Sequence, residues 1–235
     1  MTSREAGPTD LPLLETTIGA NLADTVAAHG EREALVECAS GRRWTYAELA
    51  ADVDAVALGL LALGVRAGDR VGIWAPNCAE WVLTQYATAR IGAVLVTVNP
   101  AYRTHELSFV IGQSGLRTLV AASSFKGADY AAMIDESRAE HPALVDVVLI
   151  GEPSWDALVA SGRAADAAVL DEIEAGLSNS DPINIQYTSG TTGFPKGATL
   201  SHRNILNNGW FVGELIDYSE HDRICIPVPF YHCFG

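Results

Sequence analysis

The chain has 235 residues, of which 49% are apolar and 19% are charged, so it can bury a large core and is not a disordered chain. Its formal charge of −14 argues against unspecific binding to nucleic acid or to an anionic membrane surface. The cysteines show no CxxC pair, and the first residues lack the basic start and apolar run of a secretory signal. We therefore expect a soluble, cytoplasmic protein with reduced thiols, no protein metal site and no transmembrane segment.

The first part of the sequence predicts a leader followed by two helices. Residues 1–16 are expected to form an amino-terminal leader. A helix is expected from Thr17 to Gly30, because glycine is favoured just after the last turn of a helix. Thr45 and Glu48 have the spacing of a capping box, which indicates that an apolar-periodic helix follows over residues 49–63.

From residue 71 onward, apolar stretches of strand length alternate with helix-like stretches of about ten residues. The expected strands are 34–38, 43–46, 71–74, 93–98, 116–121, 145–150, 183–187 and 223–230. The expected helices in this part are 79–91, 104–114, 128–139, 155–160 and 202–217, with a peripheral helix and linker within 161–180. Such alternation is typical of parallel βαβ units. The sequence therefore predicts an α/β fold in which helices flank parallel-rich sheets.

The segment YTSGTTGFPKGA, residues 187–198, follows a predicted strand and carries groups that bind a polyphosphate. Its glycines let the backbone approach a ligand closely, while its hydroxyl groups and its ammonium group add donors and positive charge. The chain has only two lysines, Lys126 and Lys196, so a lysine in this loop is notable. The candidate binding residues are Thr188, Ser189, Gly190, Thr191, Thr192, Gly193 and Lys196.

Other phosphate-binding patterns fit this loop less well. The Walker A pattern, G-x-x-x-x-G-K-[ST], fails because Pro195 and Gly197 flank Lys196, where the pattern needs a glycine and a hydroxyl residue. A kinase-type G-x-G-x-x-G is absent as well. A flexible surface loop is the remaining alternative, and the composition of all twelve residues favours phosphate binding over it.

The loop TSGTTGFPKG, residues 188–197, resembles the signature phosphate loop of the adenylate-forming superfamily, which includes acyl-CoA synthetases, luciferases and peptide-synthetase adenylation domains. Further landmarks of that superfamily occur in the right order from about residue 17 to the end of the chain. They are WTYAEL at 44–49, GDRV at 68–71, VNPAY at 98–102, SHRN at 201–204 and PFYHCFG at 229–235. Residues 181–188, DPINIQYT, and residues 230–233, FYHC, most resemble medium-chain fatty acyl-CoA synthetases.

This resemblance implies an acid–thiol ligase that joins a fatty acid to the α-phosphate of ATP, releases pyrophosphate and then forms acyl-CoA with CoA. It implies that residues 188–196 grip the β- and γ-phosphates and that Mg²⁺ bridges phosphate oxygens with few protein ligands. It also implies that His232 lies beside the acyl carboxylate as the candidate catalytic residue. The expected partners are these small molecules, and the acyl chain length and oligomeric state stay open.

Several residues near the carboxyl end have competing interpretations. A satisfied histidine at a strand end is the alternative for His232. A Cys–His nucleophile formed with Cys233 is rejected, because adjacent residues on a strand point to opposite faces. His202 follows a helix cap and is expected to have a local structural role. Trp210 and Phe230 are expected to pack in the core rather than to line an acyl tunnel.

Other elements of the resembled family do not occur in the sequence. They are an aromatic-Gly-x-Thr-Glu segment, an acidic residue for the ribose hydroxyls and a lysine on a small carboxyl-terminal domain. We therefore divide the chain into the leader, 1–16, and the amino-terminal part of an adenylation domain, 17–235, and expect this part to be inactive alone. Two alternatives stay open: adenylation of an aryl or amino acid for another acceptor, and a non-catalytic fragment that binds a nucleotide or a partner.

Overall fold

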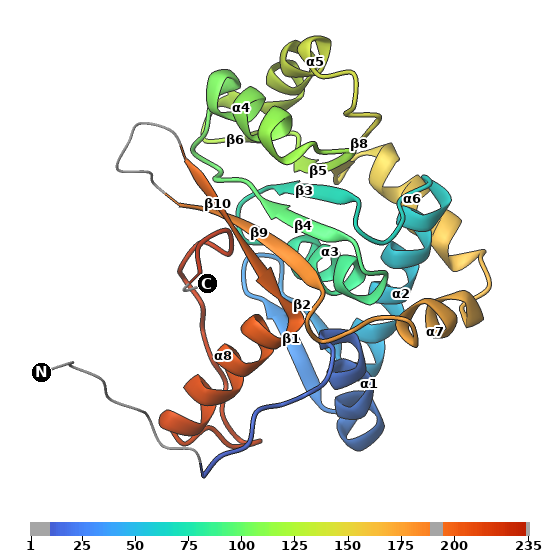
Figure 1. Ribbon diagram of the computed structural model, residues 1–235, viewed down its shortest axis with the longest axis vertical. Coiled ribbons are helices and arrows are strands. Elements are labelled where there is room, and N and C mark those ends of the chain that lie inside the picture. The colour runs from blue at the N-terminus through green and yellow to red at the C-terminus, as the bar shows by residue number, and fades with distance from the viewer. Residues whose placement is uncertain (1–9, 189–194, 234–235) are drawn as a thin grey trace, which may run out of the picture.

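The computed structural model describes residues 10–188 and 195–233 of the chain (Figure 1). Its helices are α1 (Ile18–His29), α2 (Tyr46–Ala62), α3 (Ala79–Arg90), α4 (Thr104–Ser114), α5 (Tyr130–Glu140), α6 (Pro153–Arg163), α7 (Ala168–Glu174) and α8 (His202–Leu215). Its strands are β1 (Glu33–Glu37), β2 (Arg42–Thr45), β3 (Arg70–Trp74), β4 (Val94–Thr97), β5 (Thr118–Ala122), β6 (Ser124–Phe125), β7 (Ala128–Asp129), β8 (Asp146–Ile150), β9 (Pro182–Thr188) and β10 (Lys196–Ser201).

A mostly parallel sheet forms the centre of the described part of the molecule. Its strand order is β10-β9-β4-β3-β5-β8, and all neighbouring strands are parallel except β10, which pairs antiparallel with β9. Small antiparallel hairpins, β1–β2 and β6–β7, lie outside this sheet. The predicted α/β class with a parallel-rich sheet is therefore confirmed.

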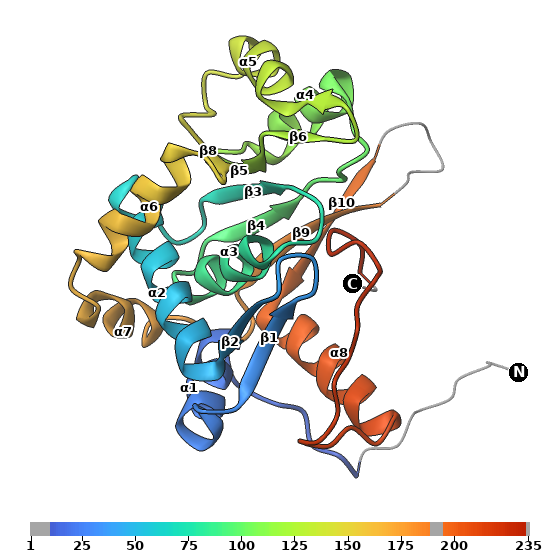
Figure 2. The same cartoon turned by 180° about the vertical axis from the view of Figure 1, so that it is seen from behind.

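Helices cover both faces of the central sheet, as Figures 1 and 2 show. One apolar cluster joins the sheet to α1, α2, α3, α6 and α7, and it contains Val71 and Ile73 of β3. The other joins the sheet to α4 and α5, and it contains Trp74 at the end of the same strand. Successive side chains of β3 alternate between the two clusters, because neighbouring residues of a strand face opposite sides. Burial on both faces explains why the strands are almost continuously apolar.

Helix α2 begins at a capping box and packs closely against α6. The Thr45 hydroxyl accepts a hydrogen bond from the Glu48 N–H at 3.2 Å, and the Glu48 carboxylate accepts one from the Thr45 N–H at 2.8 Å. The predicted capping box is thus confirmed, although the helix already begins at Tyr46. On the far side, α6 packs against α2 so closely that a Cβ atom at Gly162 would overlap the Ala55 carbonyl oxygen.

The last residues of the expected leader contact helix α8. The side chain of Asn207 accepts a hydrogen bond from the Leu14 N–H at 2.7 Å and donates one to the Leu14 carbonyl at 3.0 Å. Glu15 forms an ion pair with Arg203 at 2.8 Å. These contacts attach the chain before α1 to a helix that lies almost two hundred residues later in the sequence. The boundary at residue 16 between leader and adenylation domain stays a prediction.

Two expectations near the carboxyl end are wrong. Residues 196–198, predicted to be part of a loop, belong to β10, because this segment pairs with β9 from Lys196↔Thr188 to Ser201↔Pro182. Residues 223–230, predicted to be a strand, form no regular element. A strand needs a neighbouring strand for its N–H and C=O groups, and within the described residues this segment contacts side chains at the end of the sheet instead.

None of the described helices combines the length and the apolar character that crossing a lipid bilayer would need.

Candidate functional site

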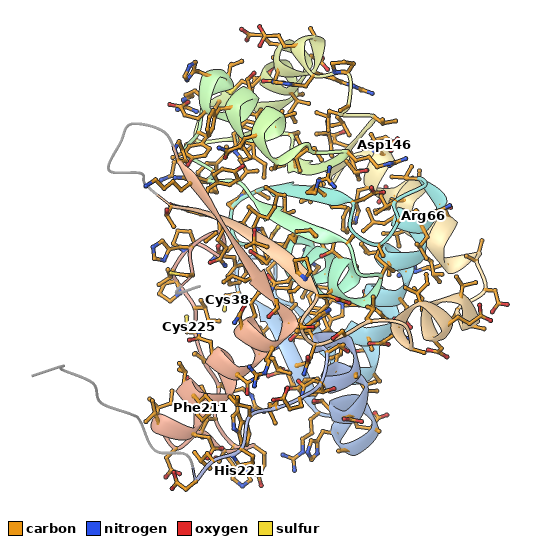
Figure 3. The ribbon with its side chains drawn as sticks, viewed as in Figure 1. Cys38, Arg66, Asp146, Phe211, His221 and Cys225 are labelled. Carbon is orange, nitrogen blue, oxygen red and sulfur yellow. The ribbon has the colours of Figure 1, made fainter. Side chains whose placement is uncertain are left out.

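The parallel strands β3, β4 and β9 all end at one edge of the sheet, the carboxyl edge. The opposite edge, where the parallel strands begin, is marked in Figure 3 by two labelled residues: Arg66, which precedes β3, and Asp146, which begins β8. Helix α3, which follows β3, covers one face of the sheet, and α4, which follows β4, covers the other. The chain passes from β3 to β4 on one side of β3 and then from β4 to β5 on the other side, so the strand order reverses at β3. An open α/β sheet usually binds its ligand outside the carboxyl ends of the strands near such a reversal. The fold therefore indicates a site at the carboxyl edge of the sheet, around the end of β3.

The β9–β10 hairpin brings both ends of the predicted phosphate loop to this edge (Figure 1). Thr188 ends β9 and Lys196 begins β10, directly opposite it in the pairing register. The Thr188 hydroxyl donates a hydrogen bond to the Lys196 carbonyl at 3.4 Å, and both side chains are exposed. The other candidates, Ser189, Gly190, Thr191, Thr192 and Gly193, lie outside the described residues. The structure thus places Thr188 and Lys196 together and leaves the five residues between them untested.

The segment that carries His232 lies on the same edge. The Thr97 hydroxyl, at the end of β4, donates a hydrogen bond to the Tyr231 carbonyl at 3.2 Å. The side chain of Asn77, in the loop after β3, accepts a hydrogen bond from the Phe230 N–H at 2.8 Å. His232 is exposed immediately after these two anchored residues. The candidate catalytic residue is therefore held near the carboxyl ends of β3 and β4.

Tyrosine side chains link the hairpin to the loop after β4. Burial raises the pKa of Tyr102, and the nearby Tyr231 and Glu106 raise it further. Burial also raises the pKa of Tyr187 on β9, which Tyr102 raises further, while a hydrogen bond with Ser114 opposes the shift. These phenols are neutral at pH 7, so they can donate hydrogen bonds at this edge without adding negative charge.

Sequence reasoning missed three residues of this site. Tyr102 was present in the VNPAY landmark, and that motif was the available signal for it. The sequence did not single out Asn77 or Thr97 as site residues. Polar residues follow apolar strands at most strand ends, so their presence there does not indicate a site. Their importance comes from contact with residues more than 130 positions away.

The other residues named near the carboxyl end have mixed outcomes. His202 is fully buried and its Nδ1 accepts a hydrogen bond from the Ile18 N–H at 3.2 Å. Its role is therefore structural, as expected, but it is not local, because the bond joins α8 to the start of α1. Burial lowers its pKa. Trp210 is 38% exposed on α8, so core packing is wrong for it, whereas Phe230 packs partly buried against Trp81.

His232 and Cys233 do not point to opposite faces of a strand, as was expected from their adjacent positions. These residues are not on a strand, and the Cys233 Sγ atom lies 3.8 Å from His232 Nδ1. Both side chains are exposed. The contact joins sequence neighbours in a turn.

A groove of about 720 Å³ lies elsewhere, between α4 and α5. Several of its polar side chains bond to one another: Ser108 to His141 at 2.8 Å, and Thr104 to Glu136 at 3.3 Å. We give this groove less weight than the carboxyl edge, because these groups already have hydrogen-bond partners. Among the described residues, no group of three or more His, Cys, Asp or Glu side chains is placed to hold a metal ion.

The sequence and the fold of the chain resemble those of known proteins. Residues 22–235 match the family model described as AMP-binding enzyme. The chain is 41% identical over 254 residues to a relative named medium-chain acyl-CoA ligase ACSF2, mitochondrial, from Danio rerio. That alignment covers 100% of the chain and 42% of the relative, so the chain spans less than half the length of this curated protein.

Solved structures show the same resemblance. The inhibitor-bound amino-terminal domain of FACL13 from Mycobacterium tuberculosis has a TM-score of 0.80 and 31% identity, over 92% of this chain and 52% of that one. The anthranilate CoA ligase AuaEII, solved with anthranoyl-AMP, has a TM-score of 0.70 and 25% identity, over 85% of this chain and 37% of that one.

Proposed function

Because the chain belongs to the AMP-binding enzyme family, we propose that it is part of an enzyme that activates a fatty acid with ATP and then transfers the acyl group to CoA. One observation carries this proposal. The hairpin with Thr188 and Lys196 and the segment with His232 lie at the carboxyl edge of one parallel sheet, beside the strand ends where such sheets bind ligands. The names of the relatives agree with this activity.

The proposed role of the hairpin is to bind the phosphates of ATP. Lys196 would supply the positive charge, and Thr188, Ser189, Thr191 and Thr192 would supply hydroxyl donors around a backbone freed by Gly190 and Gly193. An ammonium group about 4 Å from a phosphate charge contributes about 4 kcal/mol at an effective dielectric near 20, before desolvation. In a chain of net charge −14, this local contribution offsets a field that repels the nucleotide.

The proposed role of His232 is to act on the carboxylate substrate. A ring N–H beside the acyl carboxylate would stabilise an oxygen whose charge changes as the carboxylate attacks the α-phosphate. The imidazole would also form one wall of the acyl site. The proposal requires His232 to be held at a constant place relative to the hairpin, because misplacement by about 1 Å is enough to slow such a reaction strongly.

The described residues do not fit a protein-bound magnesium site. They contain no suitable cluster of carboxylate or imidazole ligands, so we assign no protein ligand to Mg²⁺ and derive no step from it. A magnesium ion that arrives on the nucleotide, held mainly by phosphate oxygens, is compatible with this edge.

We also propose the class of acid substrate and the part of the adenylation domain to which the chain corresponds. The name of the Danio rerio relative favours a medium-chain fatty acid, and the AuaEII structure makes an aryl acid the second candidate. We propose that residues 17–235 are the amino-terminal part of an adenylation domain, and we keep the cytoplasm as the expected compartment.

Titration of Mg-ATP against the 235-residue chain tests the phosphate site, with binding followed by NMR line broadening of the nucleotide. The variant Lys196→Ala is compared with Lys126→Ala, which removes the other lysine on the β6–β7 turn and changes the net charge equally. We expect weak binding to the unchanged chain and to Lys126→Ala, and at least about tenfold weaker binding to Lys196→Ala. Equal binding of Mg-ATP by the two variants would contradict the proposed phosphate site.

The acid is tested with non-hydrolysable acyl-sulfamoyl adenosines, which mimic the acyl-adenylate. Tighter binding of the octanoyl compound than of the benzoyl and aminoacyl compounds supports a fatty acid. The reverse order identifies an aryl or amino acid. Lys196-dependent binding of ATP without binding of any of these compounds supports a nucleotide-binding fragment instead.

A further inference from the structure

The segment of residues 226–232 reaches the sheet without joining it. Within the described part of the chain, residues 222–227 form no regular element, and Ile226 is exposed. The hydrogen bond from the His232 N–H to the Pro229 carbonyl, at 3.0 Å, closes a local turn. A turn of this kind shapes the segment but does not fix it to another element. Its position must therefore come from side chains of the sheet.

Asn77 supplies the first of these attachments. Its Oδ1 atom accepts a hydrogen bond from the Phe230 N–H at 2.8 Å. Its Nδ2 atom donates one to the Val228 carbonyl at 2.9 Å and a longer one to the Ile226 carbonyl at 3.4 Å. The amide thus uses both its acceptor and its donors on alternate residues of the segment, as a neighbouring strand would. Among uncharged side chains, only Asn and Gln carry an acceptor and donors in this arrangement.

Two further contacts hold the same segment. The hydroxyl of Thr97, a residue with 0% exposure, donates a hydrogen bond to the Tyr231 carbonyl at 3.2 Å. The rings of Trp81 and Phe230 lie 5.4 Å apart at an interplanar angle of 54°. Asn77 follows β3, Thr97 ends β4 and Trp81 is on α3, the helix after β3, so all three anchors belong to the carboxyl edge of the sheet.

We propose that Asn77 is a positioning residue, which sets the place of His232 by clamping the backbone of residues 226–230. This inference rests on the proposed function, because it assigns to Asn77 the placement of the residue that acts on the carboxylate. The geometry behind it is that the clamp ends two residues before His232 and that Thr97 holds the residue between them. Removing the amide leaves Thr97 and the Trp81 ring contact, which do not constrain Val228.

Hydrogen exchange of the 235-residue chain tests the clamp without any activity. In Asn77→Ala, we expect amides of the peptide 226–232 to exchange at least about tenfold faster, while peptides from β4 and α3 stay within twofold of the unchanged chain. The control is Asn208→Ala, which removes an exposed asparagine on α8 and should alter neither region. Unchanged exchange in 226–232, or equal acceleration in every peptide, would overturn the proposal.

A conservative variant separates the clamp from general destabilisation. Asn77→Asp keeps the acceptor for the Phe230 N–H but turns a carboxylate toward the Val228 carbonyl. We expect the Phe230 amide to lose protection at neutral pH and to regain part of it at pH 4, where a protonated carboxyl group can again donate; protection is the measured exchange rate relative to the intrinsic rate at the same pH. Equal protection of this amide at both pH values would count against a clamp built on a donor and an acceptor.

The imidazole signals of the histidines give the link to His232. We expect the signal lost in His232→Gln to be displaced or broadened in Asn77→Ala, with the remaining imidazole signals unmoved. The octanoyl-sulfamoyl adenosine should protect residues 226–232 from exchange in the unchanged chain, and much less in Asn77→Ala. If exchange of residues 226–232 becomes faster in Asn77→Ala but the ligand protects no residue of the unchanged chain, the positioning role is supported and the proposed function is contradicted. If the ligand protects residues 226–232 of Asn77→Ala as well as those of the unchanged chain, the positioning role is overturned.

Discussion

Arg90 joins three helices through carboxylates of α2 and α7. Its guanidinium lies 2.6 Å from the Asp54 carboxylate, 3.3 Å from Asp171 and 3.7 Å from Glu174. The side chains of Arg90 and Glu174 are only 14% and 15% exposed, and that of Asp54 is 28% exposed, so solvent screens these charges weakly. Replacement of Arg90 by methionine keeps most of the side-chain volume but leaves the carboxylates facing one another without a cation.

The expected loss of stability is large. Breaking a buried ion pair by removing one partner costs about 3–5 kcal/mol, because an uncompensated buried charge remains. For a chain of this length each kcal/mol corresponds to about 2–4 °C, so we expect the melting temperature of Arg90→Met to fall by about 6–20 °C. The control is Arg163→Met, whose side chain is 65% exposed and pairs with Asp52 at 2.9 Å. A surface pair of this kind contributes at most about 1 kcal/mol.

The pH dependence gives a second test of the same reasoning. Burial raises the pKa of Asp54 and of Glu174, while Arg90 lowers both, so loss of Arg90 should raise them further. A carboxyl group with a raised pKa in the folded state stabilises that state below its unfolded pKa, and this contribution is lost as the pH rises through the folded pKa. The free energy of unfolding of Arg90→Met is expected to lie below that of the unchanged chain, and this deficit should be smaller when urea unfolding is measured at pH 5 instead of pH 7. A deficit below about 1 kcal/mol at pH 7, or one that does not shrink at pH 5, would refute this account.

Two further predictions concern packing and thiol reactivity. Gly162→Ala should strongly lower the free energy of unfolding measured in urea, since the new methyl group meets the Ala55 carbonyl. Gly209→Ala, in open space on α8, should raise that free energy by up to about 1 kcal/mol. The reverse order of these two glycine variants would show that the α2–α6 contact is not tight. Burial raises the pKa of Cys78 to about 12, while the other three cysteines are exposed, so a disulfide reagent at pH 8 should modify three thiols quickly and Cys78 only after denaturation. Four equally fast thiols would contradict the burial of Cys78.

Signals contained within a few consecutive residues were sufficient for most of the fold. The Thr45–Glu48 capping box starts α2 as predicted, because both of its hydrogen bonds lie within one turn. The alternation of apolar strands with amphipathic helices predicted the parallel sheet, since burial on both faces demands that composition. The glycine, hydroxyl and lysine content of residues 187–198 predicted a phosphate loop, and this site stays a prediction.

Contacts between distant parts of the chain decided the rest. The segment at 223–230 is apolar enough to be a strand, but a strand also needs a partner, and no short-range pattern states whether one is available. The pairing of Lys196 with Thr188 is equally a matter of register between two segments. Asn77 meets Phe230 across 153 positions of sequence, so its role at the edge of the sheet exists only in three dimensions. The sequence by itself determined most of the helices, the strands of the parallel sheet and the chemical groups that they carry, because those properties depend on neighbouring residues. The tertiary structure alone decided which of these groups meet, because the sheet must close its hydrogen bonds and bury both faces at once.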